Sequence, residues 1–435
     1  MIKKLINKTR ELSTNEILIF FFFANLLIYL IYFILKQHLI LIQEGVIFFN
    51  DPLDHFADLL KIIFSFEFVF SNAELVRLNV PDSWIYGNPY RTVPGLNTTL
   101  TMTLPPFSVV FLVGTANLAK IIGFDYRAIL LIYIFLALFI LFKEFKSFMF
   151  KNKKFIFVLI SYPMIFLFDR GNITAFISAF CLFLFLKNYL YNDKLGNREI
   201  ILFIIACSIR PNYLVFGILF LFKESFKSNF LQFVKISSLF TAFNFLILKI
   251  SERLLPNYSL DNFLYMLNQY RESNIVFNPW NSSLQGATYN IYMYLLNNFP
   301  QLESTALKNF IDRVVISPKY IYLIFFFYLM VLFYFYYLYQ INKIDKPSLI
   351  VVLCCTTALT TTPFADYHLI IFIFTFFLII MYDNTNKYKL TLFLILLVLL
   401  PKIHYSFPNL NISNILNALL LNLLIFVNFP KNIKN

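Results

Sequence analysis

Long apolar runs recur from one end of the chain to the other, and short polar connectors separate them. About 20 apolar residues in a helix span a bilayer, so such runs predict helices that cross or enter a membrane. The runs cover residues 17–35, 107–122, 128–142, 155–168, 173–186, 200–209, 213–222, 233–248, 320–339, 349–361, 369 onward, 390–400 and 412–427. The pattern predicts an all-α polytopic membrane protein. It forms a single integral domain over residues 1–435, with about 12–13 transmembrane or re-entrant helices.

Lysine and arginine lie mostly in the connectors, where they predict the side on which each connector lies. The basic N-terminal residues place the N-terminus in the cytoplasm. Residues 36–105 and 249–318 then form two extracytoplasmic loops, the first with an interfacial amphipathic helix. Residues 107–142 read as two runs, although the flanking charges require an odd number of crossings. Whether they cross once or twice stays open at this point.

Two apolar runs, 200–209 and 213–222, are each too short to span a bilayer alone, and they meet at Arg210 and Pro211. A proline that joins two short apolar halves predicts a broken or re-entrant element. Such an element is tolerated at membrane depth only where it lines a cavity or packs inside protein.

Composition agrees with this class, because 59% of the 435 residues are hydrophobic and only 14% are charged. The net charge of +13 resides mainly in the connectors, which makes nucleic acid an unlikely partner. Phosphate-binding loops, dinucleotide fingerprints, GxSxG, HExxH and Asp-X-Asp pairs are all absent from the sequence. The four cysteines lie inside apolar runs without metal-ligand spacing, so we expect buried small side chains. We expect neither a metal nor a cofactor.

The carboxylates just after the first run form the most distinctive polar cluster. Asp54 and Asp58 are four residues apart and would share one face of a helix, with Asp51 three residues before Asp54. A carboxylate just outside a span can meet a substrate that arrives from lipid and from water. An alternative interpretation makes Asp54 and Asp58 the solvated face of an interfacial helix.

Further polar signals converge with this cluster on the predicted outer side, and ionisable residues at a membrane are costly enough to suggest function. These signals are Arg170-Gly171-Asn172, Arg210-Pro211, the NPWNSSLQG loop with Asn281 and Gln285, and Asp366-Tyr367-His368. Alternative interpretations remain open: Arg170 as a residue that snorkels at a span end, and His368 as an interfacial histidine with satisfied hydrogen bonds.

The pattern resembles the GT-C superfamily of membrane glycosyltransferases, and within it the polyprenyl-phosphate-mannose-dependent glycosyltransferase family 87. The segments that carry the resemblance are ADLLKIIF with Asp58, NPYRTVPG with Tyr90, TLPPFS, RGNITAF, SIRPNYLVFG, NPWNSSLQG and TPFADYHLI. Their order and spacing cover most of the chain. The sequence departs from the family where RGN lacks a glutamine, where NSSL replaces NQSL, and where Asp366-Tyr367 replaces Trp and a first histidine.

The resemblance implies an inverting, metal-independent transfer of a sugar from a polyprenyl-phosphate donor to a glycan or glycolipid acceptor. Mannose or another hexose or pentose is the expected sugar, transferred on the extracytoplasmic side of the inner membrane. It implies Asp58, with Asp54 as the second choice, as the general base.

His368 would position the acceptor or share its proton. Arg210 and Arg170 would stabilise the leaving phosphate. The remaining candidate substrate-binding residues are Tyr90, Asn172, Asn281, Gln285 and Asp366.

Two other functions share the sequence features. A polysaccharide polymerase or ligase also has many spans and a large outer loop with Arg and His. A flippase or transporter of lipid-linked sugars would instead place charges at the bilayer midplane, whereas most charges here lie at span ends.

Overall fold

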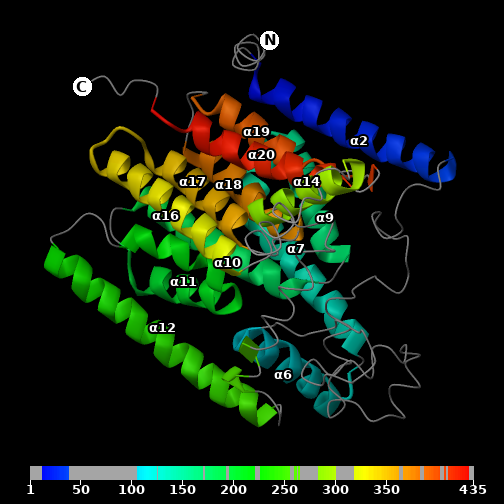
Figure 1. Ribbon diagram of the computed structural model, residues 1–435. Helices are drawn as coiled ribbons and strands as arrows, with labels where there is room; N and C mark the ends of the chain where they lie inside the picture. The colour runs from blue at the N-terminus through cyan, green and yellow to red at the C-terminus, as the bar shows by residue number, and fades with distance from the viewer. Residues whose placement is uncertain are drawn as a thin grey trace.

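The computed structural model describes residues 12–38, 105–124, 126–169, 172–192, 195–220, 226–254, 259–261, 263–264, 283–299, 318–361, 366–382, 387–401, 406–407 and 410–430. Within these ranges helices dominate, and the one sheet is a two-residue antiparallel pair, β1 (Ser406–Phe407) and β2 (Leu410–Asn411). The prediction of an all-α architecture is confirmed at this level, with helices arranged as a bundle in Figure 1.

Most apolar runs became helices with boundaries close to those predicted. The α-helices are α2 (Thr14–His38), α6 (Pro106–Ile122), α7 (Tyr126–Lys151), α8 (Ile156–Leu159), α9 (Tyr162–Asp169), α10 (Ile173–Tyr191), α11 (Asn197–Ile209), α12 (Phe226–Leu254), α14 (Leu284–Asn298), α16 (Pro318–Gln340), α17 (Lys346–Thr360), α18 (Ile370–Tyr382), α19 (Lys389–Leu399) and α20 (Ile412–Val427). The 3₁₀ helices are η1 (Lys153–Phe155), η2 (Pro211–Phe220) and η4 (Asp366–Leu369).

The core of the bundle lies around α17 and α18. Both helices are hydrophobic on every side, and all residues from 347 to 360 and from 370 to 379 are buried. Such helices need neighbours all round, and α10, α16, α19 and α20 supply them (Figure 1). Phenylalanine rings fill the space between α7, α10 and α18, for example Phe145 against Phe377 at 4.2 Å between centroids.

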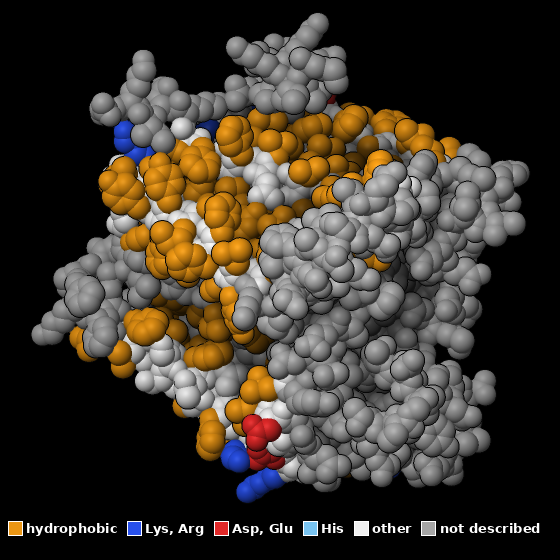
Figure 2. All heavy atoms as spheres, viewed as in Figure 1, with side chains coloured by type: hydrophobic (Ala, Val, Ile, Leu, Met, Phe, Trp, Pro, Cys, Tyr) orange, Lys and Arg blue, Asp and Glu red, His pale blue; other side chains and the backbone are white. Residues whose placement is uncertain are grey.

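The outer helices expose apolar side chains that a soluble protein would bury. Within the described residues, four helical segments are long and apolar enough to cross a membrane: Thr14–Ile31, Ile173–Tyr191, Leu231–Leu254 and Tyr320–Gln340. Only 11% of the Leu231–Leu254 window is buried, against 67% for Ile173–Tyr191 inside the bundle. Figure 2 shows one such face, covered with hydrophobic side chains. This combination is typical of a membrane protein.

The antiparallel helices give the bundle two distinct ends. At the first, which we name the Lys346 end, the Lys346 ammonium donates to the Tyr189 carbonyl at 2.9 Å, and the Tyr191 hydroxyl donates to the Met381 carbonyl at 3.1 Å. The end of α10, the start of α17 and the end of α18 therefore meet there. At the opposite end, which we name the Arg210 end, Asn212 donates to the Thr361 hydroxyl at 3.1 Å.

Two predicted segments contain structure that the hydrophobic pattern did not predict. The segment 249–318, predicted as one extracytoplasmic loop, begins while α12 is still helical and contains α14, which packs against α20 and α17. Several apolar residues of α14, including Ala287, Tyr289 and Tyr292, are buried against these neighbours, so this part of the predicted loop belongs to the bundle. The run 155–168 breaks at Ile160 and Ser161 into α8 and α9.

Residues 107–142 form two helices, with α7 continuing through the basic connector to Lys151. The turn between α6 and α7 uses Gly123 in the left-handed conformation, at φ 73°. Phe111 of α6 stacks on Tyr133 of α7 at 5.4 Å, so the two helices fold back on each other. The predicted first loop, 36–105, ends where α6 begins, and its residues from 39 to 104 lie outside the described part of the chain.

Candidate functional site

The short apolar halves around Pro211 form a helical hairpin. Helix α11 ends at Ile209, Pro211 begins η2, and η2 turns back along α11 so that the rings of Phe203 and Phe220 lie 5.2 Å apart. Thirteen α-helical residues and ten 3₁₀ residues each rise about 20 Å, so the two legs match in length. The predicted break between the two runs is confirmed, and the two legs fold back on each other as a hairpin; its re-entry into a membrane stays a prediction.

Arg210 occupies the tip of this hairpin. Its backbone N–H still donates to the Ala206 carbonyl at 2.9 Å, and its own carbonyl accepts from Tyr213 at 3.0 Å. The side chain is half-buried, and its Nε–H is buried without a hydrogen-bond partner in the described part of the chain. A buried donor that lacks an acceptor costs roughly 1–3 kcal/mol, so an anion that supplied one would gain that energy.

The charge of Arg210 reaches His368, although the two residues are far apart in the sequence. His368 is part of η4, which packs against α9 and leads into α18, and only 7% of its surface is exposed. Burial, and then the positive charge of Arg210, hold the pKa of His368 well below its usual value. At neutral pH the imidazole is therefore uncharged, and its unprotonated nitrogen can accept a hydrogen bond but takes up a proton poorly.

The surrounding elements hold this pair in place. The bond from Asn212 to Thr361 ties the hairpin tip to the end of α17, and the Ser178 hydroxyl of α10 donates to the Ala206 carbonyl of α11 at 2.9 Å. Neither Asn212 nor Thr361 is among the site residues that the sequence predicts. Asn212 directly follows Pro211, and Thr361 directly follows the end of α17. A polar residue at such a helix end was the signal that could have pointed to them.

Asn172 also lies at the Arg210 end, because it begins α10, but its side-chain oxygen serves the helix. It accepts from the Ala175 N–H at 3.1 Å and from the Thr174 hydroxyl at 3.2 Å, which makes Asn172 the N-cap of α10. The predicted sugar contact through Asn172 would have to share this residue with the cap.

Replacing Asn172 with alanine should therefore destabilise the protein by about 1 kcal/mol, because two donors at the start of α10 lose their acceptor. Thermal unfolding in detergent measures this. Asn172→Asp keeps a capping oxygen and should retain nearly all of the stability. Equal losses in both variants would contradict the capping role.

The other predicted site residues divide into two groups. Gln285 follows the N-cap of α14, Ser283, and has no exposed surface, so packing encloses it in this structure. The backbone of Asp366 begins η4. The residues that lie outside the described part of the chain are Asp51, Asp54, Asp58, Tyr90, Arg170 and Asn281.

The four cysteines are free, and three of them, Cys207, Cys354 and Cys355, are fully buried, as predicted for small apolar side chains. Among the described residues, no three His, Cys, Asp or Glu side chains lie close enough together to hold a metal ion.

The fold and this site define the class of the protein: an all-α membrane-type bundle with an arginine at one end whose charge acts on a buried histidine. Comparison with known proteins adds no narrower identity, because no family model, no curated protein and no solved structure matches the chain.

Proposed function

We propose that this protein is a membrane glycosyltransferase that moves a sugar from a polyprenyl-phosphate donor to a glycan or glycolipid acceptor. The observation that carries the proposal is Arg210 at the tip of the hairpin, with a buried Nε–H that lacks an acceptor among the described residues and a charge that reaches His368. The order of the motifs that resemble the GT-C superfamily supports it further.

The depth of Arg210 suits a lipid-borne phosphate. The hairpin extends about 20 Å from the Lys346 end, whereas the hydrocarbon core of a bilayer is about 30 Å thick. With the Lys346 end at the cytoplasmic surface, Arg210 would stop short of the outer surface, at a level that a polyprenyl phosphate reaches from the side. An arginine at that depth is costly unless it serves a ligand.

The proposed chemistry assigns each group one task. As the sugar leaves, its phosphate gains negative charge, which the Arg210 guanidinium would stabilise through two parallel hydrogen bonds. The acceptor hydroxyl must lose a proton as it attacks the anomeric carbon, and Asp58 or Asp54 would take it. His368, held neutral, would accept a hydrogen bond from the acceptor and orient it.

A transporter of lipid-linked sugars is the second candidate, because broken helices with a charged tip are also typical of transporters. One experiment separates the two: protein purified in detergent is incubated with a panel of polyprenyl-phosphate sugars and glycan or glycolipid acceptors. Sugar transfer without a membrane supports the enzyme. Binding of the donor with no transfer to any acceptor would favour the transporter.

A further inference from the structure

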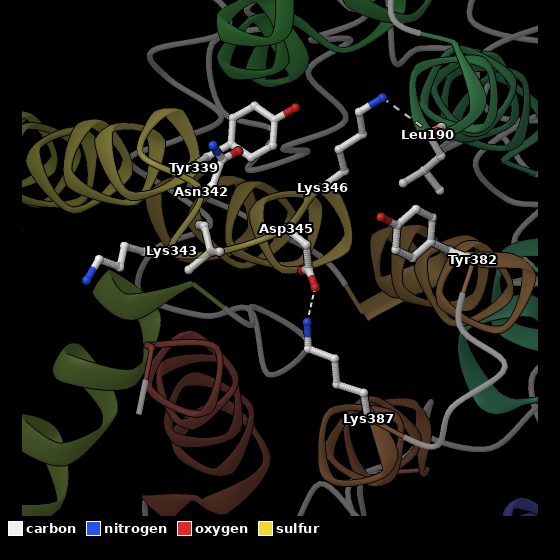
Figure 3. Close-up of a pocket in the computed structure, with 9 residues that line it drawn as sticks. Leu190, Tyr339, Asn342, Lys343, Asp345, Lys346, Tyr382 and Lys387 are labelled. Carbon is white, nitrogen blue, oxygen red and sulfur yellow. Dashed lines mark hydrogen bonds and ion pairs between the residues drawn. The ribbon is translucent and has the colours of Figure 1, made fainter. Parts of the chain in front are cut away.

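A pocket of about 470 Å³ opens at the Lys346 end, opposite the candidate site (Figure 3). The connector between α16 and α17 forms one wall, and the ends of α10 and α18 and the start of α19 complete it. The connector is well defined at both ends. Asn342 closes α16 in the left-handed conformation at φ 55°, and Asp345 caps α17 by accepting from the Ser348 N–H at 3.2 Å.

The charge of the pocket is positive. Three lysines, Lys343, Lys346 and Lys387, line it together with one carboxylate, Asp345, which leaves a net charge of three minus one, or +2, although the Lys343 ammonium points away from the other lining residues (Figure 3). Lys346 extends along one side and donates to the last carbonyls of α10, while Lys387 reaches across from the start of α19 to pair with Asp345 (Figure 3). The Tyr382 hydroxyl points toward the space between these lysines (Figure 3).

Of Lys346 and Lys387, Lys387 can change partner more easily. Its side chain is 61% exposed, whereas that of Asp345 is 21% exposed. An exposed ion pair contributes little to stability, so an incoming anion can compete for the Lys387 ammonium at small cost. The pocket thus offers an exposed ammonium group, a second one that donates to backbone carbonyls, and a phenol hydroxyl.

An apolar surface leads to the same pocket along α16. Side chains that recur every three or four residues share one face of this helix and are between 42% and 61% exposed. They are Phe326, Met330, Phe333, Tyr337 and Ile341. Ile341 directly precedes Asn342 at the pocket wall. Figure 2 shows hydrophobic side chains over this part of the molecule, with Lys or Arg side chains at its edge.

We propose that this pocket binds the phosphate headgroup of an anionic phospholipid, with the acyl chains lying along the exposed face of α16. A soluble phosphate would use the charge of the pocket but not the apolar face beside it. A neutral lipid would use the apolar face but not the charge. Basic pockets between helices at the cytoplasmic surface suit anionic headgroups. The inference is independent of the proposed sugar transfer, because it concerns the opposite end of the bundle.

The charges of the pocket allow a test with two variants of opposite sign. Lys387→Gln removes a cation and should raise the Kd for a short-chain phosphatidylglycerol about fivefold. Asp345→Asn frees Lys387 and should lower that Kd by a similar factor, while asparagine still caps α17. Lys146→Gln, an exposed residue on α7 near the same end, makes the same charge change outside the pocket and should leave the Kd unchanged. Native mass spectrometry of the full-length protein in mild detergent measures the bound lipid.

Two further ligands identify the chemistry that is bound. Phosphatidylcholine with the same acyl chains should bind more weakly than phosphatidylglycerol, and inorganic phosphate should not displace the lipid. The proposal is overturned if Lys146→Gln weakens binding as much as Lys387→Gln, or if Asp345→Asn fails to strengthen it. It is equally overturned if phosphatidylcholine binds as well as phosphatidylglycerol, or if inorganic phosphate competes at similar concentrations.

Discussion

Replacing Arg210 with glutamine should lower kcat/KM for transfer from a polyprenyl-phosphate sugar by about 10²–10³-fold. This is the range for loss of one preorganised group that stabilises developing negative charge. Glutamine is nearly as long but carries no charge and offers no forked pair of donors. The fold should survive, because the backbone bonds of Arg210 remain and a buried N–H without an acceptor is removed. A radiolabelled donor assay with purified protein provides the rates.

Two further variants serve as controls for this experiment. Arg210→Lys keeps the charge but not the paired donors, so its rate should fall between those of the parent protein and Arg210→Gln. Arg253→Gln removes an exposed arginine from the end of α12 and should leave the rate unchanged. If Arg210→Gln transfers sugar at the parent rate, the guanidinium does not act on the leaving phosphate.

Replacing Asp58 with asparagine should reduce the rate of transfer by about 10²–10⁴-fold, the usual contribution of a general base. Asparagine has nearly the same shape but cannot take the proton that the acceptor hydroxyl releases. Donor binding should persist, because the phosphate contacts assigned to Arg210 do not involve this carboxylate. Single-turnover kinetics at saturating donor would separate the loss of chemistry from a loss of binding.

Asp54→Asn is the matched control, since Asp54 precedes Asp58 by one helical turn in the predicted helix. A large loss in Asp58→Asn with a small loss in Asp54→Asn assigns the base to Asp58, and the reverse pattern assigns it to Asp54. Full activity in both variants would mean that neither carboxylate is the base.

The hydrophobic pattern predicted the helices well because the length of an apolar run is a local property. α20 begins at Ile412 and ends at Val427, as the run 412–427 predicts. The break at Arg210 and Pro211 was predicted from two short apolar runs joined by a proline. Helices were predicted less well where polar and apolar residues are mixed along the segment. α14 carries asparagine, glutamine, threonine and three tyrosines among its apolar residues, so it read as loop, although burial against α20 and α17 makes it a helix of the bundle.

The candidate site was predictable only in part. Charge placement correctly put Asn172, Arg210 and the segment with His368 at one end, since alternating helices must return chain ends to the same side. The role of Asn172 as a cap depends on hydrogen bonds to Thr174 and Ala175, and a sequence pattern cannot distinguish that cap from a sugar contact. The pocket at the Lys346 end could not be predicted, because lysines in a connector indicate only the side of the membrane on which the connector lies.

By itself, the sequence determined the class of the protein, the positions of most helices and the break at Pro211, because each depends on neighbouring residues. Only the tertiary structure decided that the two short runs fold back as a hairpin, that the charge of Arg210 acts on His368, and that three connector lysines line one pocket. These juxtapositions join residues far apart in the chain. They arise from the packing of α10, α17 and α18 around the hairpin, where the fit between many side chains, and not any single run, selects the arrangement.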